Sequence, residues 1–151
     1  MLEIKTIKNN DLLAVEKLLR DHNQIVSDLY KCINTTMAVY DQNEIIATAG
    51  FIQSEIYALV KFVVVKKDRQ MEYIGDGLLK ALLNMAEKNG IKRVFVYPKQ
   101  TEDFFLKIGF NVLDLDCADL IHTIFRNEYS NEKILEATLP EIFTKACRSN
   151  H

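Results

Sequence analysis

Residues 72–83 read EYIGDGLLKALL, and this segment places two glycines, Gly75 and Gly77, between an apolar run and a run with helical spacing. We predict that a strand ends before it, that the chain turns through the glycines, and that a helix then begins. Glycine permits close approach of a ligand to the backbone and takes positive φ without steric cost. The first amides of a helix have no internal partners and carry partial positive charge. The segment can therefore bind a phosphate through its main chain.

Cationic side chains close to this segment are expected to assist phosphate binding: Lys66, Lys67, Arg69 and Lys80. A turn that requires glycine but binds no ligand would show the same pattern, so that alternative stays open. Two other nucleotide-binding motifs are excluded. No Lys–Ser/Thr pair follows the glycines, as a phosphate loop of the Walker type requires. The third glycine of the dinucleotide fingerprint would fall at Lys80, and the preceding strands have an antiparallel pattern.

Upstream, the pattern predicts an antiparallel meander. MAVYDQNEIIATAGF, from Met37, is typical of a strand, a polar turn and a second strand. IYALVKFVVV, at 56–65, is apolar and β-branched enough for a central strand. The other expected elements are a strand at 2–7, a helix from Asn10 or Asp11 to about His22, and a helical piece at 25–33.

Downstream, helices and strands alternate, which indicates the α/β (α+β) class and one domain over 1–151. A helix ends at Gly90, and Leu139–Pro140 is expected to break a helical tail at about 130–148. The remaining expected elements are a strand RVFVY at 93–97, a helix from Thr101 to Gly109, and strands beginning at Asn111 and Leu120.

Composition excludes several classes of protein. The formal net charge is −2 and no long basic run occurs, which disfavours a non-specific nucleic-acid binder. No uncharged stretch has the length of a membrane helix and the N-terminus has no signal-peptide pattern, so we expect a cytoplasmic protein. The three cysteines, Cys32, Cys117 and Cys147, are widely spaced and predict neither a disulfide framework nor a metal site.

The succession of Gly75–Asp76–Gly77, RVFVY and FFLKIGF (104–110) resembles the core of the GNAT acetyltransferase superfamily over roughly 2–125. The resemblance implies a mixed, mostly antiparallel central sheet flanked by helices, with acetyl-CoA or CoA as the cofactor. It also implies that the pantetheine arm lies in a split between the strands at 56–65 and 93–97. The implied contacts are pyrophosphate at Glu72, Tyr73, Ile74, Gly75, Asp76 and Gly77, pantetheine at Val63, Val64 and Val65, and a cofactor wall at Phe105, which packing of its helix explains equally well.

The chain departs from the family pattern in the same segment. Glu72 stands at the usual Gln/Arg position and Tyr73 at the usual first glycine. The segment before Gly75 is about two residues longer than usual, which displaces Arg69–Gln70. A narrower similarity, over 91–110 and 124–139, is to the N-terminal acetyltransferase-like domain of citrate lyase ligases. Because the nucleotide motif of those ligases is not expected here, their ATP chemistry is not carried over.

Acyl transfer needs a proton donor for the departing thiolate. The family's usual tyrosine position is Phe105, which has no proton to give. Tyr97 is a substitute acid unless it only packs, and Glu55 is a base unless it is a solvated turn residue. The resemblance implies an acyl-CoA-dependent N-acyltransferase that acetylates a small-molecule or protein amine. The alternatives are a catalytically degenerate CoA- or acyl-CoA-binding regulatory module and an interaction protein. Leu135, Leu139, Ile142 and Phe143 of the tail are expected to pack on the domain or, as a homodimer interface, on a second copy.

Overall fold

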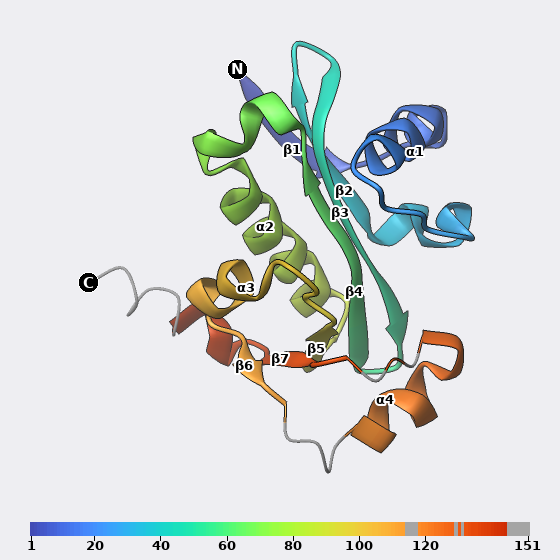
Figure 1. The fold of residues 1–151 in the computed structure, drawn as a ribbon, viewed down its shortest axis with the longest axis vertical. Helices are drawn as coiled ribbons and strands as arrows, with labels where there is room; N and C mark the ends of the chain where they lie inside the picture. The colour runs from blue at the N-terminus through green and yellow to red at the C-terminus, as the bar shows by residue number, and fades with distance from the viewer. Residues whose placement is uncertain (114–117, 129, 131, 145–151) are drawn as a thin grey trace. The chain divides into compact units, whose positions relative to one another are not determined.

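The computed structural model describes residues 1–113, 118–128, 130 and 132–144 (Figure 1). The chain forms two compact units, each made from separate stretches. Unit 1 comprises Met1–Ile52 and Lys61–Ala86, and unit 2 comprises Gln53–Val60 and Glu87–His151. The hydrogen-bonded strand order is β1-β2-β3-β4-β5-β7-β6. Within the described residues no helix is long and apolar enough to span a membrane.

Unit 1 begins as the predicted meander. β1 (Leu2–Thr6) pairs antiparallel with β2 (Thr36–Asp41), and β2 pairs antiparallel with β3 (Glu44–Ser54). Gln42 and Asn43 join β2 to β3, and both have positive φ, at 50° and 73°. This two-residue turn is compatible with the tight connection that antiparallel neighbours require. β4 (Tyr57–Val65) lies next to β3 and contributes its second half to this unit.

Helices cover both faces of the strands of unit 1 (Figure 1). α1 (Leu12–Asp21) follows the short η1 (Asn9–Asp11) and, with the 3₁₀ helix η2 (Leu29–Thr35), lies on one face. α2 (Ile74–Lys88) lies on the other face. The predicted first helix is confirmed, since its apolar side is the buried side. The core on the α1 face consists of Ile7, Val15, Leu18, Leu19, Leu29, Cys32, Ala38, Tyr40, Phe62 and Val64.

Unit 2 contains the parallel pair of the sheet. The first half of β4 pairs with β5 (Arg93–Val96), with Tyr57 opposite Arg93 and Val60 opposite Val96. β5 pairs antiparallel with β7 (Leu135–Thr138), which pairs antiparallel with β6 (Asn111–Val112). The mixed, mostly antiparallel sheet is thus confirmed. The helices of this unit are α3 (Glu102–Ile108), α4 (Ala118–Ile124) and the 3₁₀ helix η5 (Arg126–Glu128).

Two predictions for the last part of the chain are wrong. The segment from Leu120 is helix α4, not a strand, because Ile121 and Phe125 lie four residues apart and both become buried. The expected helical tail contains strand β7, which pairs with β5 along its whole length. Residues 141–144 are helical, and 145–148 of the expected tail lie outside the described residues.

The apolar side chains of the tail were predicted to pack either on the domain or on a second copy of the chain. Leu135, Leu139 and Ile142 are all buried, with exposed fractions of 0%, 3% and 2%, and Phe143 is half-buried. The first three contribute to the core of unit 2 because β7 brings the chain back onto β5. Packing on the domain accounts for these three side chains.

Candidate functional site

The glycine segment forms the first turn of α2 and not a turn before it. The 3₁₀ helix η3 (Lys67–Glu72) follows β4, Tyr73 has left-handed φ and ψ of 59° and 21°, and α2 begins at Ile74. The positive φ that glycine permits occurs at Tyr73, whereas Gly75 and Gly77 have helical conformations. Tyr73 is the residue identified at the family's first glycine position.

The first amides of α2 have no acceptor within the helix. The Gly77 amide donates to the Tyr73 carbonyl at 3.4 Å, so Gly77 is the first residue with a helical partner four positions back. The amides of Ile74, Gly75 and Asp76 precede it and have no carbonyl within the helix to accept from them. The Ile74 side chain is buried, and a Cβ on Gly77 would lie 3.8 Å from Ile4 Cδ1 of β1. The first turn is thus held against the strands of unit 1.

Arg69 is bound by two carboxylates of its own chain. Its Nε and Nη2 donate to Glu72 at 2.6 and 3.1 Å, and its Nη1 donates to Asp41 at 2.9 Å. The hydrogen bonds to Glu72, followed by those to Asp41, raise the pKa of Arg69 above its ordinary value. Glu72, which was unfavourable beside a phosphate, is therefore neutralised by a bidentate partner three residues earlier.

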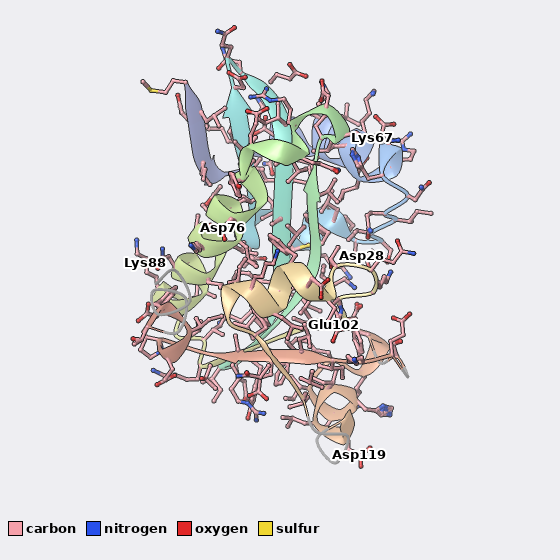
Figure 2. The ribbon with its side chains drawn as sticks, turned by 60° about the vertical axis from the view of Figure 1, so that its left-hand side comes forward. Asp28, Lys67, Asp76, Lys88, Glu102 and Asp119 are labelled. Carbon is pink, nitrogen blue, oxygen red and sulfur yellow. The ribbon has the colours of Figure 1, made fainter. Side chains whose placement is uncertain are left out.

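Two other cations near the segment are also paired. Lys66 contacts Glu44 at 2.8 Å, and this hydrogen bond raises the pKa of Lys66. Lys80 contacts Asp76 at 3.1 Å. The expected assistance from four cations is thus reduced, because three of them neutralise acids of this chain. Lys67, which has no ion pair in the part of the chain that the structure describes, projects from η3 and is exposed (Figure 2).

Further hydrogen bonds fix η3 to its neighbours. Gln70 Nε2 donates to the carbonyl of Val65 at 3.0 Å, and the Lys66 amide donates to Ile46 at 2.8 Å. Arg69 and Gln70, which the longer segment moves away from the usual position in the family pattern, therefore donate hydrogen bonds to other residues of unit 1 and stabilise η3. Sequence analysis missed Asp41 and Glu44, because they lie 28 and 22 residues from their partners and no local pattern links them.

The predicted pantetheine contacts lie at the end of β4. Val64 is buried, whereas Val63 and Val65 are half-buried, as the alternation of a strand requires. The pairing of β4 with β5 stops at Val60 opposite Val96. Val63, Val64 and Val65 therefore lie beyond the stretch of β4 that pairs with β5.

In unit 2, Phe105 is part of an aromatic cluster. Its exposed fraction is 3%, and its ring makes edge contacts with Phe104 and Phe110 at centroid distances of 5.1 and 5.2 Å. Such contacts are favourable geometries for aromatic packing. The cluster accounts for Phe105 through helix packing, which was one of its two predicted roles.

The two candidate catalytic residues lie at opposite ends of the β4–β5 pairing. Glu55 is an exposed turn residue with φ of 54° and precedes Tyr57, the first residue of β4. Tyr97 follows Val96, and its hydroxyl accepts a hydrogen bond from the Ser130 amide at 3.1 Å. Since a strand rises about 3.3 Å per residue, the register separates Glu55 from Tyr97 by roughly 20 Å. They cannot act on the same atom in this arrangement.

A surface hollow of about 300 Å³ lies elsewhere in unit 1, beside α1. Its rim carries one acid and one base, so its charge suits an amphipathic molecule better than a diphosphate. In the part of the chain that the structure describes, no cluster of His, Cys, Asp and Glu side chains could hold a metal ion. The hollow is lined by Glu16, Leu19, Arg20, Gln24, Ile25 and Val26.

Comparison with known families identifies the domain. Residues 13–119 match the acetyltransferase (GNAT) domain family, and the match includes η3, the left-handed Tyr73 and the first turn of α2. The chain belongs to the GNAT acetyltransferase family. Among curated proteins, none is similar enough in sequence to count as a match.

Solved structures show the same GNAT fold. An N-acetylglutamate synthase from Neisseria gonorrhoeae, complexed with coenzyme A and N-acetyl-glutamate, is 18% identical with a TM-score of 0.77; the alignment covers 92% of this chain and 35% of that one. A GNAT acetyltransferase from Staphylococcus aureus is 13% identical with a TM-score of 0.72, covering 92% and 99%. The PaiA N-acetyltransferase from Thermoplasma acidophilum, in complex with coenzyme A, is 18% identical with a TM-score of 0.69, covering 91% and 99%.

Proposed function

We propose that this chain is an acyl-CoA-dependent N-acyltransferase that moves an acetyl group from acetyl-CoA to an amine. The observation that carries the proposal is the GNAT match, which spans a helix whose first amides lack helical partners. Structures with the same fold were determined with coenzyme A, which supports the choice of cofactor. The acceptor is a small-molecule or protein amine, and the reaction is assigned to the cytoplasm.

The residues around the first turn of α2 fit a diphosphate. Glu72 and Asp76 are the acids closest to it in sequence, and each is paired with a base of its own chain. The positive end of the α2 dipole is therefore not opposed by an unpaired carboxylate. We assign the diphosphate to the backbone from Glu72 to Gly77 and the pantetheine arm to the backbone of Val63, Val64 and Val65.

The chemistry requires balanced movement of one proton. The neutral amine nitrogen attacks the thioester carbonyl carbon, a C–N bond forms, and the C–S bond breaks. The nitrogen loses a proton and the thiolate sulfur gains one. Tyr97 is the proposed donor of that proton. Water accepts the proton that the nitrogen loses. Glu55 cannot assist the same transfer as Tyr97, because nitrogen and sulfur are bonded to one carbon in the intermediate and the register separates the two side chains by roughly 20 Å.

Turnover tests the proposed function. The wild-type protein is incubated with acetyl-CoA and a panel of amines, and release of free thiol is measured. We expect turnover with at least one amine and a dissociation constant for CoA measurable by calorimetry. Binding without turnover on any amine would instead favour the regulatory module, and absence of binding would refute both.

Tyr97→Phe tests the proposed acid. We expect kcat to fall by about 100-fold, as loss of a general acid typically does, with little change in the KM for acetyl-CoA. Tyr57→Phe is the matched control, because Tyr57 also carries a hydroxyl in unit 2 and stacks on Phe95 at 6.2 Å. Equal activity of the two variants would remove Tyr97 from the mechanism.

We also propose that the chain is related to the N-terminal acetyltransferase-like domain of citrate lyase ligases. This relationship does not extend to the ATP chemistry of those ligases. A homodimer is likewise proposed only through surfaces other than the buried side chains of the tail.

A further inference from the structure

The guanidinium of Arg69 joins two parts of unit 1. Through Glu72 it closes η3 across three residues, and through Asp41 it ties η3 to the end of β2. The side chain of Arg69 is only 25% exposed, and Asp41 is similarly covered at 28%. A planar fork matches two carboxylates in a way that a lysine ammonium cannot. The pairing is therefore specific to arginine at this position.

Tyr73, which follows Glu72, has a backbone conformation that L-residues rarely adopt. Tyr73 has φ of 59°, and its side chain is 86% exposed. Packing of the ring therefore does not account for the left-handed conformation, which is unfavourable for a residue with a Cβ. Glu72 is adjacent to Tyr73 and is held by both of its carboxylate oxygens. The Arg69 pairing thus stabilises the turn at which α2 begins.

We propose that Arg69 is a positioning residue for the cofactor: by holding Glu72 and Asp41, it fixes the turn at Tyr73 and aims the first amides of α2 at the diphosphate. This inference rests on the proposed function, in which CoA binds at that turn. Arg69 acts through the backbone, because its hydrogen bonds are made to carboxylates of the chain. A tyrosine stands here at the first glycine position of the family pattern, and the ion pairs of Arg69 hold it in the left-handed conformation that glycine adopts without strain.

Arg69→Met is the primary variant, and calorimetry with CoA is the primary measurement. We expect the affinity for CoA to fall about tenfold, because the turn at Tyr73 loses its support. Turnover of S-acetylpantetheine, which lacks the diphosphate, should stay unchanged. Arg69→Lys should behave like Arg69→Met, since lysine cannot bridge both carboxylates. Lys17→Met on α1 is the control, and its CoA affinity should stay within about twofold because its ion pair with Asp21 is exposed and lies outside the segment at Tyr73.

A second variant separates positioning from general loss of structure. Tyr73→Gly in the Arg69→Met background should regain most of the lost affinity, because glycine adopts the required φ without strain. Wild-type affinity in Arg69→Met would overturn the inference. So would an Arg69→Met defect that extends to S-acetylpantetheine or that Tyr73→Gly does not relieve. Wild-type protein that binds no CoA would refute the proposed function itself.

Discussion

Gly50 lies where β3 passes very close to two side chains of unit 1. A Cβ at this position would lie 2.6 Å from Thr36 Oγ1 and 2.7 Å from Phe62 Cζ. Thr36 is fully buried, and its hydroxyl donates to the Cys32 carbonyl at 2.7 Å. Neither neighbour is at the end of a flexible side chain, so the space can be made only by moving the strands.

Gly50→Ala should therefore destabilise the protein by about 1–3 kcal/mol, as overpacking of a core does. The free energy of unfolding in urea measures the effect. Gly77→Ala is the matched control, because its Cβ would make an ordinary contact with Ile4 at 3.8 Å and alanine favours a helix. Destabilisation of Gly77→Ala by as much as Gly50→Ala would contradict this account of the packing.

At the residue scale, the pattern at 72–83 predicted where a helix begins, and α2 does begin there, at Ile74. That this first turn binds a diphosphate stays a prediction. The pattern did not reveal that Tyr73 takes the positive φ, because neither a tyrosine nor its local neighbours indicate that conformation. We attribute that conformation to the pairing of Arg69, which reaches Asp41 at the end of β2, and so distant a partner leaves no pattern in the segment itself.

At the scale of elements, a buried hydroxyl joins β2 to the start of α1. Tyr40 donates to Asp11 Oδ2 at 2.9 Å, and the same oxygen accepts from the Lys8 amide at 2.9 Å. Asp11, one of the two predicted caps, is the residue that precedes α1, although its side chain makes no capping hydrogen bond to the helix. Burial and then the hydrogen bond to Asp11 raise the pKa of Tyr40 well above its ordinary value of 10.0.

Tyr40→Phe should lower the free energy of unfolding by about 1 kcal/mol, the typical value of one hydrogen bond. The folded state retains the Tyr40 proton at a pH where the unfolded state loses it. The contribution of Tyr40 is therefore complete below pH 10.0 and declines as the pH rises above that value. Urea unfolding of both proteins on either side of pH 10.0 checks the sign. A stability gap that widens at high pH would be contrary to it.

Two other segments show where the spacing of apolar residues fails to predict secondary structure. The meander, α1 and α3 were predictable because their apolar residues repeat at one clear period. The segment from Leu120 is β-branched, yet it forms α4 because Ile121 and Phe125 are buried at helical spacing. Leu135–Thr138 had helical neighbours in the prediction and is nevertheless a strand, because β5 offers it an antiparallel partner. In both segments tertiary contacts outweighed the local pattern: burial of two side chains for α4, and pairing with β5 for β7.

At the scale of the whole molecule, neither unit is continuous in sequence. Unit 2 takes Gln53–Val60 from the first half of the chain and the rest from Glu87 onward. β5 needs the stretch Gln53–Val60, because Tyr57–Val60 is its parallel partner. Val94, Phe95 and Val96 are all nearly completely buried, with exposed fractions of 1%, 0% and 4%.

A fragment beginning at Glu87 should therefore not fold alone, since it exposes β5. Circular dichroism should show little structure in this fragment and a gain on mixing with the fragment that ends at Ala86. A fragment from Gln53 to the C-terminus is the control, because it restores Tyr57–Val60, and it should show more cooperative unfolding. Cooperative unfolding of the fragment from Glu87 would show that β5 needs no partner from β4.

The divided origin of unit 2 also has a consequence for synthesis on the ribosome. Tyr57–Val60 emerges well before Arg93–Val96, and at about 5–20 residues per second the interval lasts seconds. During that time β3 can cover one edge of β4, while the other edge presents unpaired amides and carbonyls on an apolar strand. The nascent chain is therefore most in need of shielding by a chaperone while α2 is emerging from the ribosome.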